Sequence, residues 1–299
     1  MKVANLNLYF YKTSKEFKII SLIFLFLFKL SFKTILKNNF NQLKVCVCTL
    51  GKNENKYIRE FVEHYEKYGV DKIYLYDNND IDGEIFENVI NDYKENGFLD
   101  ILNWRGKKGK QIKIINHCYR YNYKNYDWLI FFDIDEFIHI KDYPNVKSFL
   151  CKNKFKNCPL IYLNLVCHTD NNLLYYENKS LFKRFPEIVP NTKLGGKKLE
   201  VKFMLRGYIP HIIIKNQHFC NKKIPNCNGF GHKNKIKNIY STEPDKKYYY
   251  IDHFYSKSTE EFINKIKSGN SCIVPKNYDY ERINKYFRQS DITKEKIEL

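Results

Sequence analysis

Between residues 44 and 135, four short apolar runs are separated by three amphipathic helical patterns. The apolar runs are residues 44–50 ("KVCVCTL"), 71–78, 98–104 and 128–135 ("WLIFFDID"). Apolar side chains recur every three or four positions, as in a helix, over residues 56–69, 85–96 and 110–123. Strands that alternate with helices of about a dozen residues form βαβ units. We therefore predict an α/β fold with a mostly parallel sheet flanked by helices.

The second half of the chain is less regular. Short strands are predicted at residues 160–166, 201–206 and 211–215, and a turn is predicted at residues 170–172. Ser258 is followed three residues later by Glu261, a capping-box pattern that predicts a helix over residues 258–267. We expect a smaller mixed part after the parallel sheet. The predicted organisation is a basic and apolar segment (residues 1–43), one main domain (residues 44–270) and a tail (residues 271–299).

The N-terminal segment contains an apolar run, residues 19–28 ("IISLIFLFLF"), preceded by several lysines. Ten helical residues span about 15 Å, whereas a hydrocarbon core is about 30 Å thick. Extension to Leu36 adds length but includes Lys29 and Lys33. The alternatives are a membrane-surface anchor or short signal-anchor, a buried N-terminal helix, and a cleaved signal peptide. We expect contact with a membrane surface through residues 12–37.

This interpretation places the protein in the cytoplasm or on the cytoplasmic face of a membrane. A single-pass, signal-anchored membrane protein is the alternative. The formal charge of +18, from 51 Lys and Arg against 33 Asp and Glu, favours polyanionic partners. The lysines are scattered, with no dense cluster beyond "RGKKGK". A soluble basic surface is the simpler interpretation, so we expect no nucleic-acid partner, and a non-enzymatic nucleic-acid- or polyanion-binding protein remains the alternative function.

The nine cysteines contain no CxxC pair, which argues against a zinc ribbon or finger. Cys220 and Cys227 flank a loop-like segment and could form a bridge in an oxidising compartment. Reduced thiols in a cytosolic protein are the simpler interpretation.

Polar residues follow the predicted strands where each strand ends, and ligands of open α/β sheets bind at this carboxyl edge. Asp133 and Asp135 are separated by one residue, so in a strand their side chains share one face. Two hard oxygen ligands suit Mn²⁺ or Mg²⁺. The alternative is a solvated turn after the strand, with Glu136 beginning a helix. A dehalogenase-type phosphatase also uses such a motif, but it requires Thr or Val where this chain has Phe137.

Four stretches in order resemble the glycosyltransferases of the GT-A fold, and most closely family 92 and its family-2-like bacterial relatives. They are residues 46–80 ("CVCTLGKNEN…"), 110–137 ("…WLIFFDIDEF"), 164–185 ("NLVCHTDNN…") and 250–270 ("YIDHFYSKSTEEF…"). The resemblance covers roughly residues 44–270. It implies a Rossmann-like, GT-A-type sheet and a transferase that uses a nucleotide sugar.

The resemblance also implies roles for individual residues. A divalent cation, Mn²⁺ or Mg²⁺, would be held by Asp133, Asp135 and His253. The nucleotide-sugar donor would be bordered by Thr49, Asn53, Glu54, Asp77, Lys110, Gln111 and Lys257. The cation would stabilise the diphosphate leaving group.

The implied activity is the metal-dependent transfer of a sugar, as by a hexosyltransferase, from a UDP- or GDP-sugar to a hydroxyl of a glycan or glycolipid. An inverting transfer needs a carboxylate base. Asp170 is the candidate base, and Glu187 and Glu200 are the next choices. Relatives often carry an aromatic and glycine-bearing motif where this chain reads "LNLVCHTDNN", so the acceptor stays open.

Overall fold

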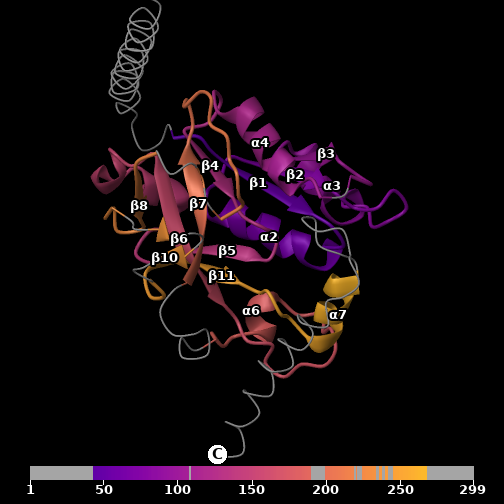
Figure 1. Cartoon of the computed structure of the whole chain (residues 1–299). Helices are drawn as coiled ribbons and strands as arrows, with labels where there is room; N and C mark the ends of the chain where they lie inside the picture. Colours follow the sequence, from indigo (N-terminus) through magenta and orange to yellow (C-terminus); the bar gives the residue numbers. More distant parts are fainter. Residues whose placement is uncertain are drawn as a thin grey trace, which may run out of the picture. The chain divides into compact units, whose positions relative to one another are not determined.

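The computed structural model describes residues 43–107, 109–189, 199–218, 220, 224–233, 236–237, 240–241 and 245–267 (Figure 1). The predicted anchor and the predicted C-terminal tail lie outside these residues. In the part of the chain that is described, no helix has both the length and the apolar character needed to cross a bilayer.

Helices and strands alternate through the first part of the described chain. The elements are β1 (Val45–Gly51), α2 (Asn55–Lys67), β2 (Lys72–Asp77), α3 (Glu87–Glu95), β3 (Leu99–Asn103), α4 (Gln111–Asn122) and β4 (Trp128–Phe131). After these come β5 (Glu136–Ile140), α5 (Val146–Leu150), a 3₁₀ turn η2 (Asn153–Phe155), β6 (Leu160–Cys167) and α6 (Leu181–Arg184). The last are β7 (Leu199–Arg206), β8 (Asn226–Asn228), β9 (Ile236–Lys237), β10 (Tyr240–Ser241), β11 (Tyr249–His253) and α7 (Thr259–Lys267).

The main path of the sheet has the strand order β3-β2-β1-β4-β7-β6-β11-β5. The first four strands in this order are parallel to one another. Beyond β4 the pairing is mixed: β7 is antiparallel to β4 and β6, β6 and β11 are parallel, and β5 is antiparallel to β11. The predicted α/β class, with a parallel sheet and a mixed C-terminal part, is therefore confirmed.

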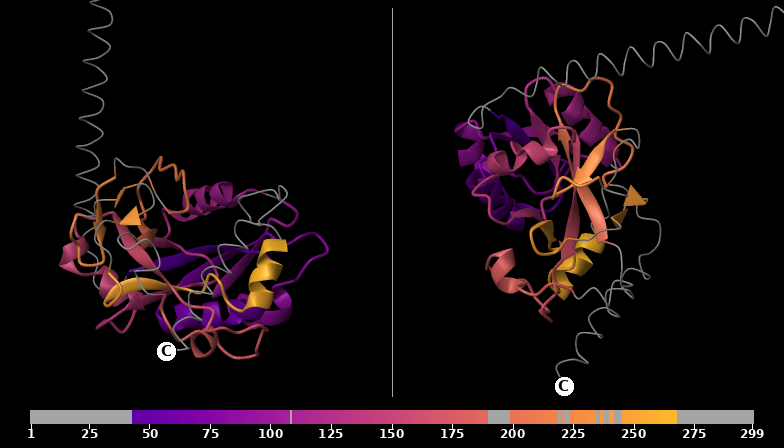
Figure 2. Two further views of the ribbon diagram at one scale, coloured as in Figure 1. Left: turned by 60° about the horizontal axis from the view of Figure 1, so that its bottom comes forward. Right: turned by 90° about the vertical axis from the view of Figure 1, so that its left-hand side faces the viewer.

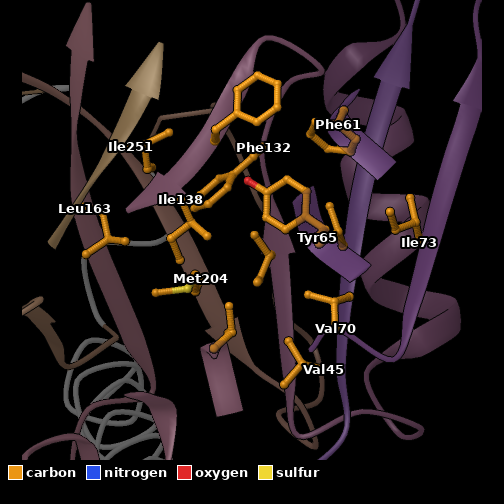
Figure 3. Close-up of a cluster of buried hydrophobic side chains, with 14 of the residues drawn as sticks. Val45, Phe61, Tyr65, Val70, Ile73, Phe132, Ile138, Leu163, Met204 and Ile251 are labelled. Carbon is orange, nitrogen blue, oxygen red and sulfur yellow. The ribbon is translucent and has the colours of Figure 1, made fainter. Parts of the chain in front are cut away.

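Alternation along β1 explains how both faces of the sheet are covered. Val45 and Val47 pack in the same apolar cluster as α2 and α3, whereas Cys46 and Cys48 pack with α4. Successive side chains of a strand point to opposite faces, so α2 and α4 cover opposite faces (Figure 1). Figure 3 shows part of the first cluster, in which Phe61 and Tyr65 of α2 face Phe132 and Ile138.

Helix α2 shows why the sequence pattern was reliable here. Its buried residues Tyr57, Ile58, Phe61, Val62 and Tyr65 recur at three and four positions. After the helix ends, Gly69 has φ +73° and donates its backbone N–H to the Glu66 carbonyl. This conformation suits glycine because it has no Cβ, so the predicted helix end is confirmed.

Two predicted strands differ in the structure. β4 ends at Phe131, and residues 134–135 form a turn in which the Glu136 backbone N–H donates to the Asp133 carbonyl. The predicted strand therefore does not extend to Asp135, and Glu136 begins strand β5, not a helix. Residues 211–215 form no strand, whereas residues 201–206 lie in β7 as predicted.

The predictions for the cysteines were wrong in two respects. Within the described residues, Cys48 is bonded to Cys118 and Cys158 to Cys227. The first disulfide joins β1 to α4. The second disulfide uses Cys227, which the sequence had suggested as a partner of Cys220, so the expected bridge does not form. The simpler interpretation, that all thiols are reduced, is also wrong.

Candidate functional site

An acidic turn connects β4 to β5 at the carboxyl edge of the parallel strands. The backbone N–H of Asp133 donates to Glu136 Oε2 at 2.9 Å, which holds the turn together. β5 pairs antiparallel with β11, and Glu136 lies opposite His253. Directly opposite residues of an antiparallel pair have neighbouring side chains. The sheet register thus brings the C-terminal histidine to the acidic turn.

Asp135, Glu136 and His253 place three ligand atoms within 4.8 Å of one another. His253 Nε2 lies 3.7 Å from Asp135 Oδ1 and 3.9 Å from Glu136 Oε1. Neighbouring ligands of an octahedral cation with bonds of about 2.1 Å lie about 3 Å apart. Small inward movements of these side chains would therefore complete three positions around Mn²⁺ or Mg²⁺.

The protonation of these groups also fits a cation. Burial lowers the pKa of His253 to about 4, so its imidazole is neutral at pH 7 and Nε2 can act as a ligand. Glu136 Oε1 is buried and lies 3.2 Å from Lys202 Nζ, with which it forms an ion pair. Burial raises the pKa of Glu136 to about 8, which means that a cation would stabilise a charge that the interior alone disfavours.

Asp133 has a different environment from Asp135. Its Oδ2 lies 2.6 Å from Nζ of Lys202, which β7 inserts between Asp133 and Glu136. Burial alone would disfavour the ammonium, but the two carboxylates raise the pKa of Lys202 above its usual value. The predicted pair is therefore divided. Asp135 belongs to the group of three potential ligands, and Asp133 is ion-paired with Lys202, with Gln111 Nε2 3.5 Å from its Oδ1.

Two further lysines reach Asp135 from the C-terminal side. Asp135 Oδ2 lies 2.7 Å from Lys265 Nζ and 3.4 Å from Lys257 Nζ. Burial alone would raise the pKa of Asp135, but the positive charges of Lys265 and Lys257 hold it well below its usual range. Lys257 Nζ is also 3.8 Å from Glu54 Oε2, so Glu54, another predicted site residue, belongs to the same cluster.

A hydrogen-bond network fixes α7, the helix that carries Lys265. Ser258 and Glu261 form the predicted capping box, with Ser258 N donating to Glu261 Oε2 at 3.0 Å and Glu261 N donating to Ser258 Oγ at 3.3 Å. Arg184 of α6 donates to Glu261 Oε2 at 2.7 Å, and Tyr57 of α2 donates to Oε1. Figure 2 shows α7 in yellow beside the first helices of the domain. Lys265 is therefore presented from a well-supported element.

A small pocket adjoins the acidic turn, with a cavity volume of about 10 Å³, roughly the space of one water molecule. Its lining comes from β1, α4, the end of β4 and β7: Cys48, Thr49, Leu50, Ile114, Ile115, Phe131, Phe132, Asp133 and Lys202. Thr49 Oγ1 is buried and has no hydrogen-bond partner among the described residues. A buried hydroxyl without a partner is costly, so it marks a place where a ligand or water would be stabilised.

The other residues predicted to border a donor lie at the ends of β1 and β2 and at the start of α4. Asp77 Oδ1 accepts from the backbone N–H of Asn79, and Asn79 Oδ1 accepts from that of Asn53, whose φ is +58°. Arg105 lies 2.7 Å from Asp77 Oδ2. Asp77 and Asn53 therefore belong to one network. Lys110 directly precedes α4 and is half-buried.

The candidate bases Asp170, Glu187 and Glu200 lie in segments other than the acidic turn. Asp170 is buried, and its Oδ1 accepts from the backbone N–H of Asn172 at 3.1 Å, which confirms the predicted turn. Glu187 is exposed, and Glu200 lies in β7 opposite Tyr240. The backbone N–H of His168 donates to the His253 carbonyl. The segment with Asp170 thus continues from a strand that adjoins the cluster.

Sequence reasoning missed Glu136 as a potential ligand, as well as Lys202 and Lys265. Lys202 had a usable signal, because it interrupts the otherwise apolar run Val201, Phe203, Met204 and Leu205. A lysine that is almost fully buried requires a charged partner. Lys265 had no such signal, since its contact with Asp135 joins residues 130 positions apart.

Comparisons with known proteins agree with the resemblance seen in the sequence. A family model described as "Glycosyltransferase family 92" matches residues 41–291. A family 92 protein of Oryza sativa subsp. japonica is 29% identical over 127 residues, which are 42% of this chain and 21% of the rice protein. A family 92 protein of Arabidopsis thaliana is 31% identical over 96 residues, 32% of this chain and 16% of that protein. The matches thus span about a fifth of the length of these curated relatives.

Among solved structures, S. aureus TarS 1–349 in complex with UDP-GlcNAc has a TM-score of 0.38 and 13% identity, covering 74% of this chain and 64% of that chain. The mannosyltransferase PcManGT from Pyrobaculum calidifontis, in complex with GDP-Man and Mn²⁺, has a TM-score of 0.30 and 12% identity, covering 46% of this chain and 42% of that chain.

Proposed function

The chain belongs to glycosyltransferase family 92, and on this premise we propose that it transfers a sugar from a nucleotide-sugar donor to a hydroxyl group. The proposed donor is a UDP- or GDP-sugar and the acceptor a glycan or glycolipid. The observation that carries the proposal is the cluster of Asp135, Glu136 and His253 beside lysines, at the carboxyl edge of the parallel strands. This edge is where ligands of α/β sheets bind.

The proposed cofactor is Mn²⁺ or Mg²⁺, held by Asp135, Glu136 and His253. Carboxylate oxygens suit both ions, and the imidazole favours Mn²⁺. When bound, the cation would supply positive charge for the diphosphate leaving group. Asp133, which was part of the predicted set, would instead hold Lys202 in place next to Glu136.

The chain's own residues would orient the donor and exclude water. Thr49 offers a buried hydroxyl at the cavity, and Asn53 and Asp77 shape the loops at the ends of β1 and β2. Lys110 directly precedes α4, and Gln111 begins the helix next to Asp133. These positions agree with residues that border a nucleotide at the strand ends.

For the acceptor side, we propose that Asp170 is the base of an inverting transfer. Its carboxylate is buried next to the turn at residues 171–172, where Asn171 and Asn172 both have positive φ. Such strained backbone is more frequent at functional sites. A base in this position would remove the proton of the acceptor hydroxyl as the sugar is transferred.

The test is hydrolysis of a panel of nucleotide sugars by the 299-residue chain, with Mn²⁺ or with EDTA. We expect hydrolysis of one donor class that stops in EDTA. Asp135→Asn should lower turnover by about a hundredfold or more, equal to about 3 kcal/mol, because the cation loses a ligand. Asp82→Asn, at an exposed acid, is the matched control.

Two results would contradict the proposal. One is full activity of the Asp135→Asn variant or of the wild type in EDTA. The other is salt-sensitive retention on DNA together with no hydrolysis of any donor, which would favour the polyanion-binding alternative.

A further inference from the structure

Asp135 faces two sets of partners whose positive charges repel each other, the lysines at Oδ2 and the candidate cation site at Oδ1. Its Oδ2 is occupied by Lys265 Nζ at 2.7 Å and by Lys257 Nζ at 3.4 Å, while its Oδ1 lies 3.7 Å from His253 Nε2. A cation bound by Asp135 and His253 would compete with both ammonium groups for the same carboxylate. We propose, on the basis of the proposed function, that Lys257 and Lys265 form a clamp that binds a diphosphate. Both lysines stay ion-paired with Asp135 until a divalent cation binds this carboxylate and displaces them.

The balance of charge supports this exchange. Four carboxylates meet three ammonium groups around the acidic turn: Glu54, Asp133, Asp135 and Glu136 against Lys202, Lys257 and Lys265. The cluster is therefore close to neutral as it stands. The four carboxylates exceed the three ammonium groups by one negative charge, so a bound divalent cation leaves one positive charge uncompensated. An anion with several negative oxygens, such as a diphosphate, restores the balance and gives the displaced lysines new partners.

Lys265 differs from Lys202 in its freedom to change partner. Lys202 is almost completely buried between Asp133 and Glu136, so it is fixed. Lys265 is partly exposed and extends from one face of α7. Its ammonium group can leave Asp135 by a change of rotamer, because the backbone of α7 is held through Glu261 and Arg184.

Lys257 shows a second sign of a functional position. It is buried at 4% exposure, its φ is +55°, and its Nζ lies 4.2 Å from the centre of the Tyr57 ring. Both a buried ammonium and a left-handed lysine cost free energy, and such features persist where the surroundings enforce them. The aromatic ring stabilises the ammonium next to the place where it would meet a phosphate.

The clamp makes cation and diphosphate binding cooperative. When the cation binds alone, it must displace the two lysines from Asp135. When a diphosphate is also present, its oxygens bind the lysines, so the lysines no longer compete with the cation. By linkage, each ligand then raises the affinity for the other by the same factor. A residue that only supports the fold would not produce such coupling.

The test is isothermal titration of Mn²⁺ into the metal-free 299-residue chain, with and without pyrophosphate as the probe. Orthophosphate is the control for a single phosphate. Mn²⁺ and pyrophosphate also combine in solution, so the affinities are compared on the free Mn²⁺ concentration in each sample. For the wild type, we expect pyrophosphate to tighten Mn²⁺ binding by on the order of tenfold, and orthophosphate to do less.

Lys265→Met should change the two affinities in opposite directions. Mn²⁺ alone should bind more tightly than to the wild type, because a competitor has been removed, and the gain from pyrophosphate should fall by on the order of tenfold. Lys265→Arg should keep the gain. The matched control is Lys267→Met, at an exposed lysine of the same helix. Lys257→Met provides a second variant, and circular dichroism checks the fold of each.

The outcomes separate the clamp from the proposed function. If Mn²⁺ binds the wild type and the Lys265→Met variant alike in both conditions, the clamp is overturned and the cation site stands. If Mn²⁺ binds the wild type in neither condition, the cation site fails and the clamp with it. If Lys267→Met behaves as Lys265→Met does, the effect is one of general charge, which also overturns the clamp.

Discussion

At Glu136, burial and charge act in opposite directions. Burial favours the neutral acid, whereas Lys202 Nζ, 3.2 Å away, favours the carboxylate. Burial has the larger effect, and the pKa of Glu136 is raised to about 8. In the unfolded chain the group titrates near its ordinary value of 4.5. Between these pH values the folded protein holds a proton that the unfolded chain has lost, so stability falls as the pH rises through this window.

This predicts a decrease in the free energy of unfolding of about 1.4 kcal/mol per pH unit above pH 6.5, up to about pH 8. The lower limit of pH 6.5 avoids the titration of His253. Burial lowers the pKa of His253 to about 4, so its contribution to the free energy of unfolding increases with pH between about 4 and its ordinary pKa of 6.5. Glu136→Gln should remove the decrease, and the exposed Glu95→Gln should keep it. Urea unfolding of EDTA-treated protein at three pH values measures it. A wild-type slope in Glu136→Gln would mean that Glu136 is ionised beside Lys202.

At the scale of elements, α7 depends on a buried ion pair for its position. The side chains of Arg184 and Glu261 are 1% and 3% exposed, and their nitrogen and oxygen atoms are 2.7 Å apart. Removing one partner leaves the other charge buried and uncompensated, which costs about 3 kcal/mol. We therefore predict that Glu261→Gln lowers the free energy of unfolding by about this amount.

The same variant should weaken the contact of Lys265 with Asp135, because α7 carries that lysine. Urea unfolding measures the stability, and the neighbouring, exposed Glu260→Gln is the control. A loss below about 0.5 kcal/mol, the range of ordinary surface substitutions, would show that the Arg184–Glu261 pair does not hold the helix in place.

The helices and strands could be predicted from the sequence wherever the spacing of apolar residues along one short segment determines the structure. The first βαβ units follow from runs of apolar residues and from the apolar face of α2, so their order and approximate bounds were predictable. The turn at Asp133 was not, because Phe132, Ile134 and Phe137 are as apolar as strand residues. The opposition of Glu136 and His253, and the contact of Lys202 with Asp133, depend on the pairing of distant strands. No local pattern contains that pairing, although the family resemblance anticipated His253.

At the scale of the whole molecule, the family match begins at residue 41 and the unit that contains the sheet begins at Leu43. We propose that residues 1–43 position the protein at a membrane and leave catalysis to the following domain, as their lysine-flanked apolar run indicates. The two disulfides bear on which side of the membrane that domain occupies. Structural disulfides form in oxidising compartments and are rare in the cytosol. We therefore favour the signal-anchored alternative over a cytoplasmic location.

The final prediction concerns these disulfides. Each closes a long loop, because Cys48 and Cys118 are 70 positions apart in the sequence and Cys158 and Cys227 are 69 positions apart. In the chain-entropy account, a loop of this length stabilises the fold by about 4 kcal/mol. Reduction should therefore lower the melting temperature, and Cys151→Ser, at an exposed thiol, should not.

Protein from the cells that naturally make it should be denatured without reductant, alkylated and analysed by mass spectrometry. We expect Cys46, Cys151 and Cys167 to be alkylated and the four bonded cysteines to be protected. Alkylation of Cys48 and Cys158 would mean that the domain folds in a reducing compartment, and the cytoplasmic location would then be preferred.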